Sequence, residues 1–304
     1  MTAASHPIRH SVQMPNRILK GARTASAVPH QAVAQPMQKL DFHRLRFYLA
    51  SMGQDSNSPR VGFLICGTQK GGTTALDAYL RRHDQLQLAA TKEVHYFDTD
   101  ELFSDTQSNH AWYHSHFQGD SKKAVWGEST PIYMYWKPAA ERIYHYNPSM
   151  KIILLLRNPI DRAYSHWNME LRRNSENLAF YDALMSEGGR CASADGKQHR
   201  VYSYTDRGFY TKQIASLRSY FPESHIHIAK SEFLLHQPRE CLNSICCFLG
   251  IAPLENTTPL RAHSLPYTQP MQAKERIFLR SVFSEEIQSL EQMLQWDCSA
   301  WLNF

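Results

Sequence analysis

The sequence predicts an α/β fold in which helices flank a central parallel sheet. The apolar run Val61–Cys66 leads into a glycine-rich turn, and residues 73–83 then follow a helical pattern. A second apolar run, Lys151–Leu156, is typical of a strand covered on both faces. Strands and helices continue to alternate toward the C-terminus, which favours parallel strands joined by crossover helices.

The remaining elements follow from local start and stop signals. Pro138 suits the first turn of a helix that reaches Tyr146, and Asn147-Pro148 ends it. Further periodic segments predict a helix at 160–174 and a strand at 226–229. They also predict helical regions at 231–249 and 273–294. Residues 187–208 interrupt this order because they are rich in Gly, Ser, Ala and charge. We expect a long loop there, either a functional lid or a mobile segment.

Positive charge is concentrated near the N-terminus. The net charge of residues 1–60 is +6, whereas that of the whole chain is +5. Residues 61–304 therefore have a net charge of −1. Such a near-neutral region argues against nucleic acid or a long polyanion as partner, because both demand a basic face. Residues 1–40 contain no Asp or Glu, as in a disordered tail or an organelle transit peptide, and we favour the tail. Leu40–Met52 has partial helical periodicity and could dock on the domain.

We therefore divide the chain into a basic, disordered tail and linker at residues 1–58 and a folded domain at 59–304. The six cysteines form no Cys-x-x-Cys pair, which indicates buried thiols in a reducing compartment. No apolar run approaches the length that crosses a bilayer, and no signal-peptide core is visible. We expect a soluble, cytoplasmic protein without a membrane anchor, and the sequence does not indicate its oligomeric state.

The turn Gly67–Thr74 has the features of an anion site. A glycine-rich turn that opens a helix points several backbone N–H groups at one place, where a phosphate can bind. Lys70 adds a mobile charge, and Thr73 and Thr74 add hydroxyl donors. In a Walker-type loop the lysine follows the last glycine, whereas Lys70 precedes Gly71. That order disfavours ATP or GTP, and a turn without a ligand is the structural alternative.

A second candidate anion site follows the Lys151–Leu156 strand. The guanidinium of Arg157 suits a phosphate, and Ser165 on the next helix adds a hydroxyl. The carboxyl ends of parallel strands share one edge, so Arg157 is expected beside the glycine-rich turn. The alternative is that Arg157 pairs with Asp161.

Between these two sites lie Glu93 and His95. They are two residues apart, so in an extended segment both side chains point to the same face. A carboxylate and an imidazole placed together could take a proton from an acceptor. The alternative is a surface Lys92–Glu93 pair with a packed histidine.

These segments resemble the sulfotransferases that use 3′-phosphoadenosine 5′-phosphosulfate (PAPS), above all the heparan-sulfate-type branch and its bacterial relatives. The resemblance rests first on the glycine-rich turn, on Lys-Glu-x-His-Tyr-Phe-Asp at 92–98 and on Arg157…Ser165. Further similar stretches are Gly127–Pro131, Asp206–Tyr210, Tyr220–Pro222 and Asp297…Leu302.

The resemblance implies a P-loop-like fold and in-line transfer of a sulfuryl group from PAPS without a metal. It implies that Glu93 is the general base and that Lys70 and His95 complete the catalytic set. The residues implied to bind the donor are Thr68, Gln69, Lys70, Gly71, Gly72, Thr73 and Thr74 at the 5′-phosphosulfate, Arg157 and Ser165 at the 3′-phosphate, and Tyr210. Residues 261–274 are the expected place of the loop that completes the 3′-phosphate pocket.

The chain departs from the resemblance at Glu128-Ser129, where several heparan-type enzymes carry a lysine. Loss of that cation favours a small-molecule or weakly charged glycan acceptor, whose hydroxyl or amine would be sulfated. A heparan-type polysaccharide is the alternative acceptor. A P-loop nucleotide kinase and a non-catalytic nucleotide-binding module are alternatives of other classes.

Overall fold

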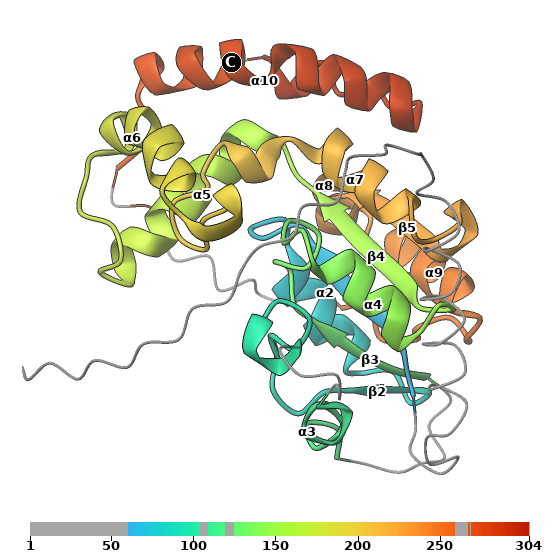
Figure 1. Ribbon diagram of the computed structural model, residues 1–304. Coiled ribbons are helices and arrows are strands. Elements are labelled where there is room, and N and C mark those ends of the chain that lie inside the picture. The colour runs from blue at the N-terminus through green and yellow to red at the C-terminus, as the bar shows by residue number, and fades with distance from the viewer. Residues whose placement is uncertain (1–59, 104–108, 119–124, 259–266, 268, 304) are drawn as a thin grey trace, which may run out of the picture. The chain divides into compact units, whose positions relative to one another are not determined.

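The computed structural model describes residues 60–103, 109–118, 125–258, 267 and 269–303. The expected tail at 1–58 and the segment Leu40–Met52 lie outside these residues. The described residues form a five-stranded parallel sheet with the strand order β2-β3-β1-β4-β5 (Figure 1). The strands are β1 Val61–Gly67, β2 Leu86–Leu88, β3 Val125–Ser129, β4 Lys151–Leu156 and β5 Ile226–Lys230.

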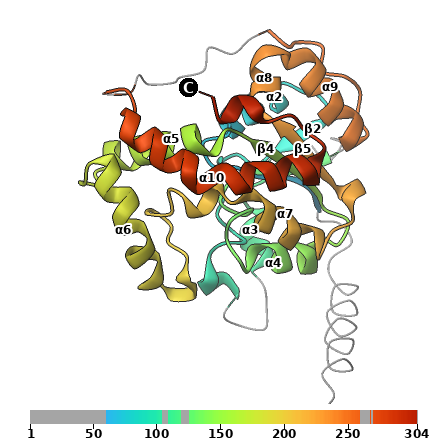
Figure 2. The same ribbon diagram turned by 90° about the horizontal axis from the view of Figure 1, so that it is seen from above.

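Helices connect the strands and extend the chain beyond the sheet. The α-helices are α2 Thr73–Leu80, α3 His110–His114, α4 Ala139–Tyr146, α5 Pro159–Arg172, α6 Phe180–Ala192, α7 Tyr210–Arg218, α8 Ser231–His236, α9 Pro238–Leu249 and α10 Ala273–Leu294. Short 3-10 turns lie at Asp100–Phe103, Asp195–Lys197, Asp206–Gly208, Glu223–His225 and Ser299–Trp301. The long helix α10 runs beside α5 and α7 (Figure 2).

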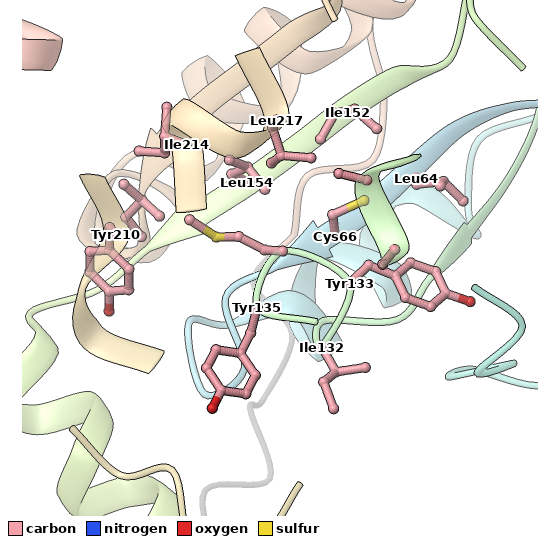
Figure 3. Packing of buried hydrophobic residues seen from close by; sticks show 14 of the residues in the cluster. Leu64, Cys66, Ile132, Tyr133, Tyr135, Ile152, Leu154, Tyr210, Ile214 and Leu217 are labelled. Atoms are coloured by element: carbon pink, nitrogen blue, oxygen red, sulfur yellow. The ribbon is translucent and has the colours of Figure 1, made fainter. Parts of the chain in front are cut away.

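The two faces of the sheet bury separate cores because alternate residues of each strand point to opposite sides. Ile153 and Leu155 of β4 belong to the core that α2, α8 and α9 cover. Ile152 and Leu154 belong to the other core, where they pack against α7 (Figure 3). After Lys151, β4 is therefore apolar and buried at every position, as in a strand covered on both faces.

The parallel α/β fold expected from the sequence is confirmed, and the helix expected at 273–294 has those bounds. The long loop expected at 187–208 is wrong at its start, since α6 continues to Ala192. Polar contacts also order the segment that follows. The Glu187 carboxylate accepts from the backbone amides of Thr205 and Asp206 at 2.7–2.9 Å. The sequence suggested a loop because the segment has few apolar residues. The buried Glu187 carboxylate orders it by hydrogen bonds instead.

All six cysteines lie in the described part of the chain, and all are free thiols. Five are buried as expected, whereas Cys247 is exposed. Among the helices of the described residues, none is both long enough and apolar enough to cross a bilayer.

Candidate active site

The glycine-rich turn leaves β1 at the carboxyl edge of the sheet and opens α2. The amide of Thr68 donates to the carbonyl oxygen of Leu155 at 2.9 Å, and the amide of Gly71 donates to the carbonyl oxygen of Thr68 at 2.8 Å. A Cβ atom at Gly71 would lie 2.4 Å from the Leu155 oxygen, so only glycine fits. Gly72 precedes α2 with a φ of 96°, in the left-handed region that glycine tolerates. The turn is therefore closed tightly against β4.

Lys70 and Arg157 meet at this edge, as the sequence predicts. Nη1 of Arg157 donates to the backbone carbonyl oxygen of Lys70 at 3.2 Å. Burial lowers the pKa of the Lys70 ammonium, and Arg173, Arg157 and Arg172 lower it further, while Glu93 opposes them. Several cations thus gather around one half-buried lysine. That imbalance suits a bound anion, whose charge would relieve the repulsion.

The other candidate donor-binding residues surround this point at different depths. Thr68, Thr73 and Ser165 are buried, whereas Thr74 is exposed. Ser165 lies on α5, whose first residue follows Arg157-Asn158 directly. The buried hydroxyl of Tyr210 donates to the carbonyl oxygen of Arg157 at 2.8 Å. Tyr210 therefore supports the backbone of Arg157.

Arg207 joins the site although the sequence assigns it no role. Its Nη1 donates to Oε1 of Gln69 at 2.6 Å, so it ties the Asp206–Gly208 turn to the glycine-rich turn. The guanidinium is fully buried and stacks over the Tyr135 ring at 4.7 Å. Burial lowers the pKa of Arg207 to about 10. Its signal in the sequence was its place inside a stretch that resembles the family.

Glu93 and His95 lie together, but not for the reason expected. An extended segment was predicted, whereas both residues have left-handed backbones, with φ of 63° and 57°. This conformation is costly for residues other than glycine, so surrounding contacts must hold it. Oε2 of Glu93 lies 3.8 Å from Nε2 of His95, and Oε1 contacts the Lys92 ammonium. The alternative of a Lys92–Glu93 pair is thus present alongside the Glu93–His95 pair.

Asp98 and Arg200 extend this pair inward. Nδ1 of His95 lies 3.0 Å from Oδ2 of the fully buried Asp98, which also pairs with Arg200. The Asp98 hydrogen bond raises the pKa of His95. Burial alone would raise the pKa of Asp98, but hydrogen bonds from His95 and Arg200 leave it lowered. Sequence reasoning missed both residues, although the three-residue spacing of His95 and Asp98 is a usable turn signal.

Two further expectations need correction. Glu128 was expected to stand where an acceptor-facing cation would help, but it is buried, and its carboxylate accepts from Tyr113, Thr130 and Tyr133. Glu128 therefore gives no information on the acceptor. Asp161 was the alternative partner of Arg157, but it pairs with Arg276 at 3.2 Å.

Part of the expected 3′-phosphate pocket, residues 261–266 and 268, lies outside the described residues. In the described ranges, no three or more His, Cys, Asp or Glu side chains gather in a way that could hold a metal ion. The arrangement found is a tight turn rich in backbone amides, several cations and a carboxylate–imidazole pair.

The chain is similar to known proteins over most of its length. The family model described as "Sulfotransferase domain" matches residues 62–287. Heparan sulfate glucosamine 3-O-sulfotransferase 5 of Homo sapiens is 28% identical over 242 residues, which cover 77% of this chain and 67% of that protein. Heparan sulfate glucosamine 3-O-sulfotransferase 6 of Mus musculus is 29% identical over 241 residues, 78% of this chain and 65% of that protein. The chain thus spans about two thirds of the length of these curated relatives.

A solved structure, the sulfotransferase from Alicyclobacillus acidocaldarius, has the same fold. It aligns with a TM-score of 0.68 at 26% identity, covering 81% of this chain and 100% of that chain.

Proposed function

Because this chain belongs to the sulfotransferase family, we propose that it moves a sulfuryl group from PAPS to a hydroxyl or amine of an acceptor. One observation carries the proposal. The cation cluster around Lys70 and the Glu93–His95 pair lie close enough for Glu93 to influence the pKa of Lys70. An anionic donor and a proton acceptor would therefore meet at one edge of the sheet, where ligands of parallel sheets bind.

The residues present fit PAPS as donor. PAPS carries charge at its 5′-phosphosulfate and at its 3′-phosphate, so it needs cations in two places. Lys70 and the amides of the first turn of α2 suit the 5′-phosphosulfate, because the first amides of a helix have no acceptor within the helix. Arg157 suits the 3′-phosphate, with Ser165 of α5 as a hydroxyl donor.

The chemistry proposed is in-line transfer. The acceptor oxygen or nitrogen bonds to sulfur while the bond from sulfur to the bridging oxygen of the 5′-phosphate breaks, which leaves the desulfated nucleotide. Glu93 takes the acceptor proton as general base, and His95 lies beside it within the Asp98 pair. Lys70 stabilises the charge that develops on the bridging oxygen, as fixed cations do in phosphoryl transfer.

For the acceptor, we propose a small molecule or a weakly charged glycan. Residues 61–304 sum to −1, so the domain as a whole lacks the excess of cations that binds long polyanions.

The second candidate is a heparan-type polysaccharide acceptor. The names of the relatives favour it, and so does a pair of cations at the end of α5. Arg172 and Arg173 both lower the pKa of Lys70, and Arg173 also pairs with the Glu170 carboxylate at 3.3 Å. Cations there could bind an acidic sugar beside the reacting hydroxyl.

The experiment that tests the function is a sulfation assay. The protein is incubated with PAPS and with one of two acceptor sets, a panel of small hydroxyl and amine compounds or a heparan precursor. Mass spectrometry of the products then detects the mass of one added sulfuryl group. Transfer to the small panel supports the proposal, and transfer to the precursor alone supports the second candidate. ATP replaces PAPS in a parallel reaction, and phosphorylation there would instead indicate a kinase.

A further inference from the structure

We propose that Tyr133 and Glu128 form a positioning pair that holds the turn carrying Glu93 and His95 in its left-handed conformation. Neither residue reaches the site itself: both are buried, at 1% exposure each. The proposal rests on the proposed function in that it takes Glu93 as the base. It goes beyond it by assigning a role to a hydroxyl and a carboxylate in the core.

The backbone amides of residues 93–97 are the first step. The amide of Glu93 donates to the carbonyl oxygen of Ser129 at 3.0 Å. The amide of Val94 faces the Glu128 carboxylate and lowers its pKa. The amides of Tyr96 and Phe97 donate to the Tyr133 hydroxyl at 2.9 and 3.4 Å. Three of the five amides in this turn are thus held, one by the end of β3 and two by Tyr133.

The hydroxyl of Tyr133 has the right number of bonding positions for this task. It has one proton and two lone pairs. The proton is donated to Oε1 of Glu128 at 2.8 Å, so both lone pairs remain to accept from Tyr96 and Phe97. Glu128 therefore orients the hydroxyl, and the hydroxyl in turn holds the backbone. Figure 3 shows the ring of Tyr133 pointing away from that of Tyr135, whose hydroxyl contacts Asp206.

The turn needs such support. Left-handed backbones are strained at non-glycine residues, and this turn has two of them, Glu93 and His95. Without fixed partners for its amides, the segment would relax toward ordinary conformations and move the Glu93 carboxylate. A displacement of about 1 Å at a catalytic group can lower turnover a hundredfold.

Tyr113 provides a matched control. Its hydroxyl donates to the same Oε1 of Glu128, at 3.0 Å, and its ring is buried in the same core as that of Tyr133. The amides of Tyr96 and Phe97 donate to the hydroxyl of Tyr133, not to that of Tyr113. Tyr133→Phe and Tyr113→Phe therefore each remove one hydrogen bond to Glu128, but the first alone also removes the support of the turn.

The experiment compares both variants with wild type in two measurements. The first is kcat and KM for sulfation, with calorimetric binding of the desulfated nucleotide. We expect Tyr133→Phe to lower kcat about ten- to a hundredfold with nucleotide affinity unchanged, and Tyr113→Phe to keep a kcat near that of wild type. The second is hydrogen exchange of the backbone amides of residues 92–98 without substrate, which should speed up in Tyr133→Phe alone.

Equal losses of kcat in the two variants, or a full kcat in Tyr133→Phe, would overturn the positioning role. So would unchanged exchange of the 92–98 amides in Tyr133→Phe. The exchange measurement needs no activity. If wild type transfers no sulfuryl group to any acceptor, the proposed function fails. Faster exchange in Tyr133→Phe alone would still show that Tyr133 holds the turn.

Discussion

The guanidinium of Arg157 donates to the backbone carbonyl oxygen of Lys70 across 3.2 Å. The residue that follows β4 thereby supports the turn that follows β1, although 87 positions separate them in the chain. Within the described part of the chain, Arg157 uses Nη1 for this contact, which leaves its other N–H groups for a second partner. One side chain can thus order the turn and bind a phosphate.

Replacing either cation should weaken binding of the desulfated nucleotide. Lys70→Ala and Arg157→Ala each remove a charge-assisted contact to phosphate, worth about 1.5–3 kcal/mol or roughly ten- to a hundredfold in affinity. Calorimetry measures the change. Arg239→Ala, an exposed cation on α9, is the control and should bind as wild type. Unchanged affinity in both site variants would refute the donor assignment.

Removing the proposed base should affect turnover rather than binding. Glu93→Gln keeps the shape of the side chain but removes its basicity, so we expect kcat to fall by about 10²–10⁴-fold with nucleotide affinity near normal. Steady-state kinetics and calorimetry on the same protein separate the two quantities. If His95→Ala abolishes turnover and Glu93→Gln does not, the base is His95.

A methyl group at Gly71 should disrupt the turn. The added Cβ would lie 2.4 Å from the backbone oxygen of Leu155, which cannot move without distorting β4. We expect Gly71→Ala to unfold at lower denaturant concentration and to bind nucleotide more weakly. Gly188→Ala is the matched control, because nothing lies within 4 Å of its Cβ in α6. That variant should be more stable by about 0.5–1 kcal/mol, and similar behaviour of both would contradict the packing described.

Glu128 should make stability depend on pH. Burial raises the pKa of its carboxyl from 4.5 to about 7. From pH 4.5 to 7 the folded protein therefore keeps a proton that the unfolded chain has released, so the free energy of unfolding falls as the pH rises through this window. Between pH 5 and 8, urea titrations should show wild type losing about 2–3 kcal/mol more than Glu128→Gln. Parallel pH curves for the two proteins would contradict this assignment.

The sheet could be predicted because its signals are local. In the run Lys151–Leu156, the five residues after the lysine are all apolar, which is typical of a strand covered on both faces. The start and end of α10 match the periodic segment at 273–294. The meeting of Lys70 and Arg157 could also be predicted, since parallel strands end at one edge. The placement of these two residues followed from topology rather than from any contact visible in the sequence.

What could not be predicted depends on buried polar contacts. The residue type of Glu128 suggests a surface charge, but in the fold its buried carboxylate accepts from the hydroxyls of Tyr113 and Tyr133. The left-handed backbones of Glu93 and His95 have no signal in residue type, because neither is glycine. Arg207 likewise donates to Gln69, although 138 positions separate the two residues in the sequence. Such contacts form only after the strands are in place.

The strand order has a consequence for how the chain folds. β1 is the central strand, but its neighbours β3 and β4 are synthesised later. The apolar strand β1 therefore leaves the ribosome before the strands that pair with it. The glycine-rich turn waits longer still, since its contact with Arg207 closes a loop of 138 residues. Long-range closures of this kind slow folding and leave apolar strands exposed to aggregation meanwhile. The turn that holds the proposed donor is thus among the first parts of the domain to be synthesised and among the last to be completed.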